Sequence, residues 1–156
     1  MAGGARKAEG GWRADVEAMR AEPPRQLLFL CVANSARSQM AEGIGRSLAP
    51  PAVRISSAGA SPTMVRSEAI QVLDEIGIDI SEHRAKAVAS LADVESVDTV
   101  ITLCAEEVCP VFLHRARRFH WPLPDPAAVP AGEGRLAAYR AVRDELRRRL
   151  EALFAG

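Results

Sequence analysis

Short runs rich in hydrophobic residues alternate along the chain with longer segments in which hydrophobic residues recur every three or four positions. The short runs predict four strands, at residues 27–32, 53–57, 99–103 and 118–121. The first run is apolar at every position, as is typical of a parallel strand buried on both faces. The periodic segments predict helices at residues 38–48, 64–76 and 134–154, and a single helical turn at 91–95.

The order of these elements predicts an α/β fold, in which a small parallel sheet is covered on both faces. Cys31, Ser57, Cys104 and Asp125 lie at or just after the ends of the successive strands. Ligands of such sheets bind outside the carboxyl ends of the strands. We therefore expect these four residues to share one rim of the sheet.

The N-terminal segment differs in composition from the rest of the chain. Residues 1–11 are rich in glycine and alanine and are expected to be mobile. A short amphipathic helix is predicted at residues 12–22, with Trp12, Val16 and Met19 on one stripe. We interpret residues 1–24 as a partly flexible extension that packs on the surface, and residues 25–156 as one domain.

Charge and composition narrow the function classes. Twenty basic and twenty acidic residues cancel, which gives no reason to expect nucleic acid or an anionic membrane as a partner. No hydrophobic run has the length of a membrane span, and the N-terminus lacks the apolar core of a secretory signal. We expect a cytoplasmic monomer, in which three cysteines indicate chemistry more than a disulfide framework.

The stretch after the first strand combines a cysteine with an anion-binding loop. Cys31 is followed at the spacing Cys-x5-Arg-Ser by Arg37 and Ser38. Asn34 tolerates the left-handed backbone that such a loop needs, and Ser38 is a suitable N-cap for the following helix. The helix N-terminus favours an anion and a thiolate, and Arg37 offers a planar fork to a tetrahedral oxyanion. The predicted oxyanion-binding residues are Val32, Ala33, Asn34, Ser35, Ala36, Arg37 and Ser38.

Cys31 is thus predicted to be a nucleophile, and the alternative is a buried structural cysteine beside a surface arginine. Cys104 and Cys109 enclose four residues, and three interpretations apply to them: metal ligands, inert cysteines or a redox pair. Because the spacing to the nearby histidines is poor for zinc, and because Cys31 is already a candidate reactive thiol, we favour the redox pair. Asp125 lies between two prolines and is either a turn residue or a general acid held in a stiff loop.

Taken together, these segments resemble the thioredoxin-coupled arsenate reductases built on the low-molecular-weight protein tyrosine phosphatase fold. The similarity runs from about residue 26 to the C-terminus. The segments that carry it are residues 31–42, Ser57-Ala-Gly59, Gly77-Ile-Asp-Ile-Ser81, residues 100–104, Cys109-Pro110, His120-Trp121 and Asp125-Pro126.

The resemblance implies a three-layer α/β sandwich with a four-stranded parallel sheet, and a thiol relay that reduces arsenate. Cys31 would attack arsenate held by the loop and Arg37, while Asp125 helps an oxygen to leave. Cys104 would attack Cys31, release arsenite and leave a Cys31–Cys104 disulfide, which Cys109 converts into a Cys104–Cys109 disulfide. Thioredoxin would reduce that disulfide, with mycothiol as another possible donor. Phosphate and sulfate are expected to compete with arsenate.

Other functions differ from this one in identifiable residues. A phosphatase of the same fold would use Cys31, Arg37 and Asp125 but neither of the later thiols, and weak phosphatase activity is compatible with the reductase. A non-catalytic oxyanion-binding module would not need Cys31. Some members of the family bind potassium through an acidic residue in a segment where this chain has Arg84 and Lys86, so we expect no metal and no cofactor.

Overall fold

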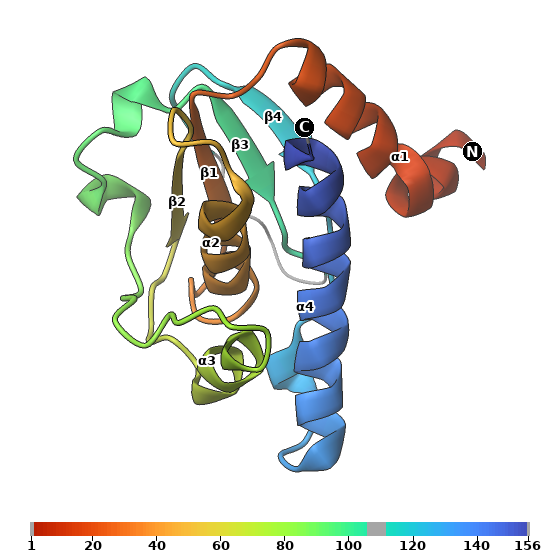
Figure 1. Cartoon of the computed structure of the whole chain (residues 1–156), viewed down its shortest axis with the longest axis vertical. Coiled ribbons are helices and arrows are strands. Elements are labelled where there is room, and N and C mark those ends of the chain that lie inside the picture. The colour runs from red at the N-terminus through yellow and green to blue at the C-terminus, as the bar shows by residue number, and fades with distance from the viewer. Residues whose placement is uncertain (1, 106–111, 156) are drawn as a thin grey trace.

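The computed structural model describes residues 2–105 and 112–155 (Figure 1). Its helices and strands are α1 (Ala2–Ala21), β1 (Gln26–Cys31), α2 (Arg37–Leu48), β2 (Arg54–Gly59), α3 (Ser67–Asp74), β3 (Thr99–Thr102), β4 (Arg117–His120) and α4 (Glu133–Phe154). Three short 3₁₀ turns complete the list: η1 (Val88–Ser90), η2 (Val94–Ser96) and η3 (Pro126–Ala128). Among the described residues, no helix combines the length and hydrophobicity that crossing a bilayer requires.

The four strands form one parallel sheet in the order β2-β1-β3-β4. Strand β1 is central, and its residues are paired with β2 on one side and with β3 on the other. Each predicted strand is present with its ends within two residues of the expected ones. The prediction of a four-stranded parallel sheet is therefore confirmed, and the carboxyl ends of all strands point to the same rim.

Alternate residues of β1 face two separate clusters of buried side chains. Leu27 and Phe29 pack with residues of the four α-helices, whereas Leu28 and Leu30 pack with Val97, Val100 and Phe112 on the other face. The second face is covered by the segment that carries η1 and η2, through Val88, Leu91 and Val94. Successive strand residues point to opposite faces, so a fully apolar β1 is what a sheet covered on both sides requires.

Two helical predictions need correction. The segment predicted as a helix from residue 64 is helical only from Ser67, because the preceding residues pair with the anion loop instead. The turn predicted at residues 91–95 is replaced by η1 and η2 on either side of residues 91–93. In the first place, backbone hydrogen bonds to the anion loop prevail over local helical periodicity. In the second, short local bonds such as that from the Leu91 N–H to the Val88 carbonyl form two 3₁₀ turns.

The N-terminal extension forms a longer helix than expected. Helix α1 begins at Ala2, ten residues before the predicted start, while the mobility of its glycine-rich part stays a prediction. The predicted stripe is confirmed, since Trp12, Val16 and Met19 are buried and belong to the main core. Figure 1 shows α1 beside the C-terminal end of α4, with its own N-terminal end directed away from the sheet.

Candidate functional site

The anion loop occupies residues 32–36, between the end of β1 and the start of α2. Asn34 adopts the left-handed conformation predicted for it, with φ of 50°. The end of β2 passes so close to the loop that a Cβ atom at Gly59 would lie 2.4 Å from the carbonyl oxygen of Val32. Glycine at this position therefore allows the loop to close tightly around its centre.

The segment of residues 61–66, which follows β2, supports the loop from outside. The backbone N–H groups of Ser61, Thr63 and Arg66 donate to the carbonyl oxygens of Val32, Ala33 and Ser35, at 2.9, 3.1 and 2.9 Å. These bonds use carbonyl oxygens of the loop, so the loop N–H groups are not consumed by this pairing. A backbone fixed in this way can present its N–H groups to an anion without reorganising.

Cys31 lies at the inner end of a chain of buried hydrogen bonds. Its Sγ atom is 2.8 Å from the Ser38 hydroxyl, which accepts a hydrogen bond from Asn34 Nδ2 at 2.8 Å. The same amide donates to Ser57 Oγ at 2.9 Å, and Ser57 donates to Glu42 Oε1 at 2.5 Å. All five side chains are buried.

The donors in this chain can be assigned from the chemistry of the groups. An amide N–H only donates and a carboxylate only accepts, so Asn34 and Glu42 fix the direction at the Ser57 hydroxyl. Ser38 accepts from Asn34 and can therefore direct its own proton at Cys31 Sγ. A sulfur that accepts a hydrogen bond is better suited to be a thiolate than a thiol.

The prediction that Ser38 caps α2 is wrong. The helix begins at Arg37, its N-cap position is Ala36, and that position makes no side-chain cap hydrogen bond. The physical reason is that the Ser38 hydroxyl is already engaged with Cys31 and Asn34. Residue 38 therefore acts on the cysteine, and the N-terminal N–H groups of α2 face the loop without a side-chain cap.

The side chain of Asn34 is held in place by two hydrogen-bond donors that sequence reasoning missed. Its Oδ1 atom accepts from Gln39 Nε2 at 2.9 Å and from the backbone N–H of Lys86 at 2.8 Å. Gln39 also donates to the Arg84 carbonyl at 2.8 Å, and its Oε1 lies 3.0 Å from His83 Nδ1. The segment 83–86 thus ties the loop to α2, which offsets the strain of the left-handed residue.

Glu42 is the charged centre of this network. Its side chain is 3% exposed and lies 3.1 Å from Arg46 and 3.4 Å from Lys86, with His83 Nδ1 at 3.6 Å. Burial lowers the pKa of His83, while the Glu42 carboxylate opposes that shift and Arg46 and Lys86 add to it. The amphipathic pattern of α2 placed residue 42 on a helix but gave no sign of its partners. These are Ser57 of β2, 15 positions away, and His83 and Lys86, more than 40 positions away.

Arg37 reaches the opposite side of the loop. It is 4% exposed, and its NH1 group donates to the carbonyl oxygens of Leu123 at 3.0 Å and Leu103 at 3.4 Å. These carbonyls follow β4 and β3, so the guanidinium lies across the carboxyl ends of the strands. This position suits the predicted role of a fork that binds an oxyanion.

The other predicted site residues lie at the same rim, with one outside the described residues. Cys104 is buried and follows β3. The residue before it, Leu103, donates its N–H to the Leu30 carbonyl next to Cys31, at 2.9 Å. Asp125 follows β4 and accepts from the Ala127 N–H at 3.0 Å, so it does serve a turn, while its role as an acid stays a prediction. Cys109 lies outside the described residues, and so does any account of its pairing.

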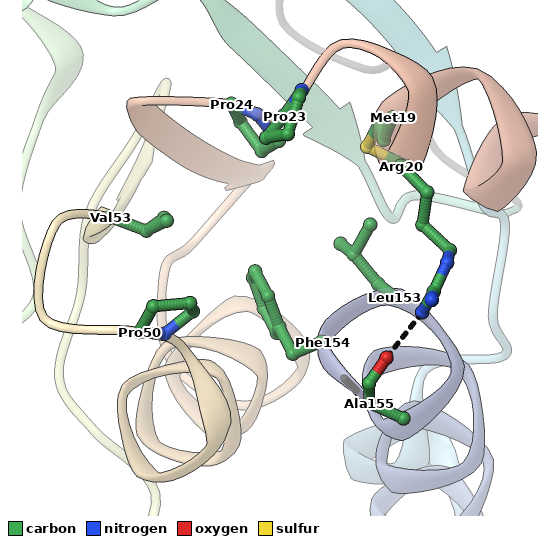
Figure 2. Close-up of a pocket in the computed structure, with 9 residues that line it drawn as sticks. All are labelled: Met19, Arg20, Pro23, Pro24, Pro50, Val53, Leu153, Phe154 and Ala155. Atoms are coloured by element: carbon green, nitrogen blue, oxygen red, sulfur yellow. Dashed lines mark hydrogen bonds between the residues drawn. The ribbon is translucent and has the colours of Figure 1, made fainter.

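No group of three or more His, Cys, Asp or Glu side chains suited to a metal ion occurs among residues 2–105 and 112–155. A hollow of about 220 Å³ lies between α1, the turn at Pro50 and the end of α4, at the amino ends of the strands (Figure 2). It is thus at the opposite edge of the sheet from Cys31. The chemistry indicated at the carboxyl rim is that of a nucleophilic thiol in an anion cradle, next to a second buried thiol.

Comparisons with known proteins agree with this geometry. The family described as low molecular weight phosphotyrosine protein phosphatase matches residues 26–156. An arsenate reductase from Halalkalibacterium halodurans is 39% identical over 128 residues, which are 80% of this chain and 91% of the relative. A solved arsenate reductase in a phosphate-binding state is 31% identical, with a TM-score of 0.70 over 84% of this chain and 97% of the other.

A solved thioredoxin-dependent arsenate reductase from Corynebacterium glutamicum is also similar. It is 27% identical, with a TM-score of 0.58 over 93% of this chain and 69% of the other. Residues 26–156 make up less than 93% of this chain, so the part that matches this structure includes some of the N-terminal segment. The fold predicted from the sequence is thereby confirmed by solved structures as well as by the strand order.

Proposed function

Because the chain belongs to the low molecular weight phosphotyrosine protein phosphatase family, we propose that it acts on a tetrahedral oxyanion, and that it reduces arsenate to arsenite. The observation that carries the proposal is the second buried thiol, Cys104, at the end of the strand beside the one that ends in Cys31. A phosphomonoester hydrolase needs one nucleophile and a leaving-group acid, whereas reduction needs thiols that can give up two electrons.

In the proposed first step, the Cys31 thiolate attacks arsenate bound by the loop N–H groups and Arg37. An arsenate oxygen leaves as water once it has been protonated, for which Asp125 is the candidate acid. The product is a covalent adduct between Cys31 Sγ and arsenic. Ser38, whose hydroxyl lies 2.8 Å from the sulfur, supports this step by stabilising the attacking thiolate.

The second step is the reduction itself. The Cys104 thiolate attacks Cys31 Sγ, the S–As bond breaks, and arsenic leaves with that electron pair as arsenite. The two thiols lose two electrons and become a Cys31–Cys104 disulfide. We propose that Cys109 then attacks Cys104, which restores the Cys31 thiol and moves the disulfide to Cys104–Cys109.

We propose thioredoxin as the reductant that resets the enzyme, in keeping with the solved relative whose name states that dependence. Phosphate is expected to compete with arsenate, since both are tetrahedral oxyanions of similar charge. The sequence leaves mycothiol as the alternative donor. Residence in the cytoplasm and a monomeric state remain predictions from composition.

The test follows arsenate-dependent NADPH oxidation with thioredoxin and thioredoxin reductase supplied in excess. Steady turnover is expected from the wild-type protein, none from Cys31→Ser, and no more than a single turnover from Cys104→Ser or Cys109→Ser. Hydrolysis of an aryl phosphate, measured in parallel, should be lost in Cys31→Ser and retained in the other two variants. If the wild-type protein hydrolyses the aryl phosphate but shows no arsenate-dependent NADPH oxidation, with thioredoxin or with mycothiol as the donor, it is a phosphatase instead.

A further inference from the structure

Helix α1 is joined to the catalytic domain by well-formed contacts, although it precedes the residues that the family description matches. At its C-terminal end, Arg20 donates to the carbonyl oxygens of Ala152 and Ala155 at 3.0 and 2.5 Å, as Figure 2 shows for Ala155. These carbonyls lie at the C-terminal end of α4 and at its C-cap residue, where carbonyl groups lack partners within the helix. Trp12 and Met19 are buried against the main core.

The second attachment leads to the catalytic rim. Trp121 follows β4 directly and is 1% exposed, and its indole Nε1–H donates to Asp15 Oδ2 of α1 at 3.0 Å. A buried indole N–H needs an acceptor, and here α1 supplies it. Arg149 of α4 lies over both indole rings, 5.5 Å from the centre of Trp12 and 5.8 Å from that of Trp121.

Arg149 is itself fixed in this position. Its side chain is 8% exposed, and its Nε is bonded to Glu145 Oε2 at 2.6 Å. A guanidinium that lies over two aromatic rings and is held by a carboxylate has little rotational freedom. The indole of Trp121 is therefore constrained on its face by α4 and at its N–H by α1.

Trp121 belongs to a short segment, residues 121–123, that also accepts a hydrogen bond from Arg37. Its backbone N–H donates to Thr102 at 2.8 Å, and the N–H of Leu123 donates to Leu103 at 3.1 Å. The carbonyl of Leu123, two residues after Trp121, accepts from Arg37 NH1 at 3.0 Å. The Trp121 side chain, which α1 holds, and the Leu123 carbonyl, which orients Arg37, therefore belong to one segment whose backbone is fixed by hydrogen bonds to residues 102 and 103.

We propose that α1 is a brace for the oxyanion site, in which Asp15 is a positioning residue that acts through Trp121 and Leu123 on Arg37. The proposal rests on the proposed function only in that Arg37 binds a tetrahedral oxyanion. It makes no use of the later thiol steps. Displacement of the 121–123 segment by a fraction of an ångström would move the acceptor of Arg37 and with it the plane of the fork.

The test compares Asp15→Ala with Asp15→Asn and with Glu17→Ala, using inorganic phosphate as the probe. Asn retains a side-chain oxygen that can accept from the indole, whereas Ala does not. Glu17→Ala is the matched control, because it removes an exposed carboxylate from the same helix two residues away. Phosphate affinity is measured by isothermal titration calorimetry at a temperature where circular dichroism shows each variant fully folded.

We expect the phosphate dissociation constant to rise on the order of fivefold in Asp15→Ala and to stay near the wild-type value in the other two variants. In a Trp121→Phe background, which has no indole N–H, Asp15→Ala should have no further effect on phosphate affinity. A merely structural role would lower the melting temperature of Asp15→Ala and leave the dissociation constant unchanged, which would overturn the proposal. An equal loss of affinity in Glu17→Ala would overturn it as well.

These outcomes are separable from those of the proposed function. If the wild-type protein binds phosphate but shows no arsenate-dependent NADPH oxidation, the reductase proposal fails and the brace is still decided by the phosphate data. If the wild-type protein binds no phosphate, Arg37 holds no oxyanion and the brace is overturned directly.

Discussion

The two sides of the anion loop are held by contacts of different kinds. On the side of β2, buried side chains bond to one another in a continuous network from Cys31 to Glu42. On the side of β3 and β4, Arg37 bonds to backbone carbonyls, and the chain that carries one of them is held by Trp121. We call these the network side and the carbonyl side.

This difference determines how each side responds to mutation. Each group of a buried polar network depends on its partners, so the removal of one group leaves others without hydrogen bonds. Backbone carbonyls cannot be removed by substitution, so the carbonyl side should fail only when Arg37 is changed or when the backbone shifts. Apart from Cys31, the proposed nucleophile, and Ser38 beside it, substitutions on the network side should therefore act mainly on stability. Substitutions on the carbonyl side should act mainly on catalysis.

Among the substitutions that leave all three thiols in place, the largest effect on catalysis is expected from Arg37→Lys. Lysine keeps the charge but replaces the planar fork with a point charge that cannot bind an oxyanion in a bidentate manner. We expect kcat/KM for arsenate to fall by roughly 10²- to 10³-fold, as for the loss of one preorganised oxyanion donor. Coupled NADPH oxidation gives this ratio.

Because the carbonyls of Leu103 and Leu123 remain, the free energy of unfolding of Arg37→Lys should fall by no more than about 1–2 kcal/mol. Urea unfolding, followed by circular dichroism, provides this control. An unchanged kcat/KM would mean that the loop N–H groups hold the oxyanion without the fork, and the carbonyl side would lose its proposed role.

On the network side, Glu42→Ala is expected to act mainly on stability. The substitution leaves the buried Ser57 hydroxyl without its acceptor and Lys86 without its carboxylate. We expect the free energy of unfolding to fall by about 2–4 kcal/mol, compared with about 1 kcal/mol or less for Arg46→Ala, whose side chain is largely exposed. Glu42→Gln should lie between them, because its amide oxygen can still accept from Ser57. Equal losses in all three would show that Glu42 is not the centre of the network.

The sequence was sufficient to predict the parts of the site that depend on local order. A strand, a cysteine, a loop and an arginine at fixed spacing led to the correct positions of Cys31, Asn34 and Arg37. Strand ends likewise predicted the rim at which Cys104 and Asp125 lie. These features follow from the order of the elements along the chain, because parallel strands bring their carboxyl ends to one rim whatever the structure of the segments between them.

The features that the sequence did not reveal depend on contacts between distant segments. Ser38 fits the pattern of an N-cap, and only the position of Asn34 shows that its hydroxyl is used elsewhere. Glu42 reads as an ordinary helix residue until the segment around Lys86 folds over it. The link between Asp15 and Trp121 spans more than 100 positions and has no local signature.

The pH dependence of stability should also separate the two sides. Burial lowers the pKa of His83, so protonation in the folded state is less favourable than in the unfolded chain. The stabilising contribution is complete above the unfolded pKa of about 6.5 and is lost as the pH falls through the lower, folded value. Between pH 7.5 and 5, the wild-type protein should therefore lose more unfolding free energy than His83→Gln.

The groups that face His83 are Glu42, Arg46, Lys86 and Asp79, and they are present in both proteins of this comparison. The difference between the two urea-unfolding series therefore isolates the imidazole. Identical slopes in the two series would mean that His83 does not resist protonation, and that the segment 83–86 contributes to the network through Lys86 and Arg84 alone.

The smallest effect is expected from a hydroxyl on α4 that has no role in either set of contacts. Tyr139 is fully buried, and its hydroxyl has no hydrogen-bond partner among the residues that the structure describes. Burial raises the pKa of Tyr139 to about 12, so the group carries no charge near neutral pH and its removal changes no charge. Tyr139→Phe should be neutral or stabilising, by up to about 1 kcal/mol in urea unfolding.

Ser57→Ala is the matched substitution on the network side, since it also removes one buried hydroxyl group. That hydroxyl accepts from Asn34 and donates to Glu42, so its loss should cost about 1–3 kcal/mol. A cost above about 1 kcal/mol for Tyr139→Phe would mean that an ordered water molecule serves the phenol. Polar connections would then extend beyond the network side to the interior face of α4, and the division between the two sides of the loop would be less sharp than the hydrogen bonds of Cys31 and Arg37 indicate.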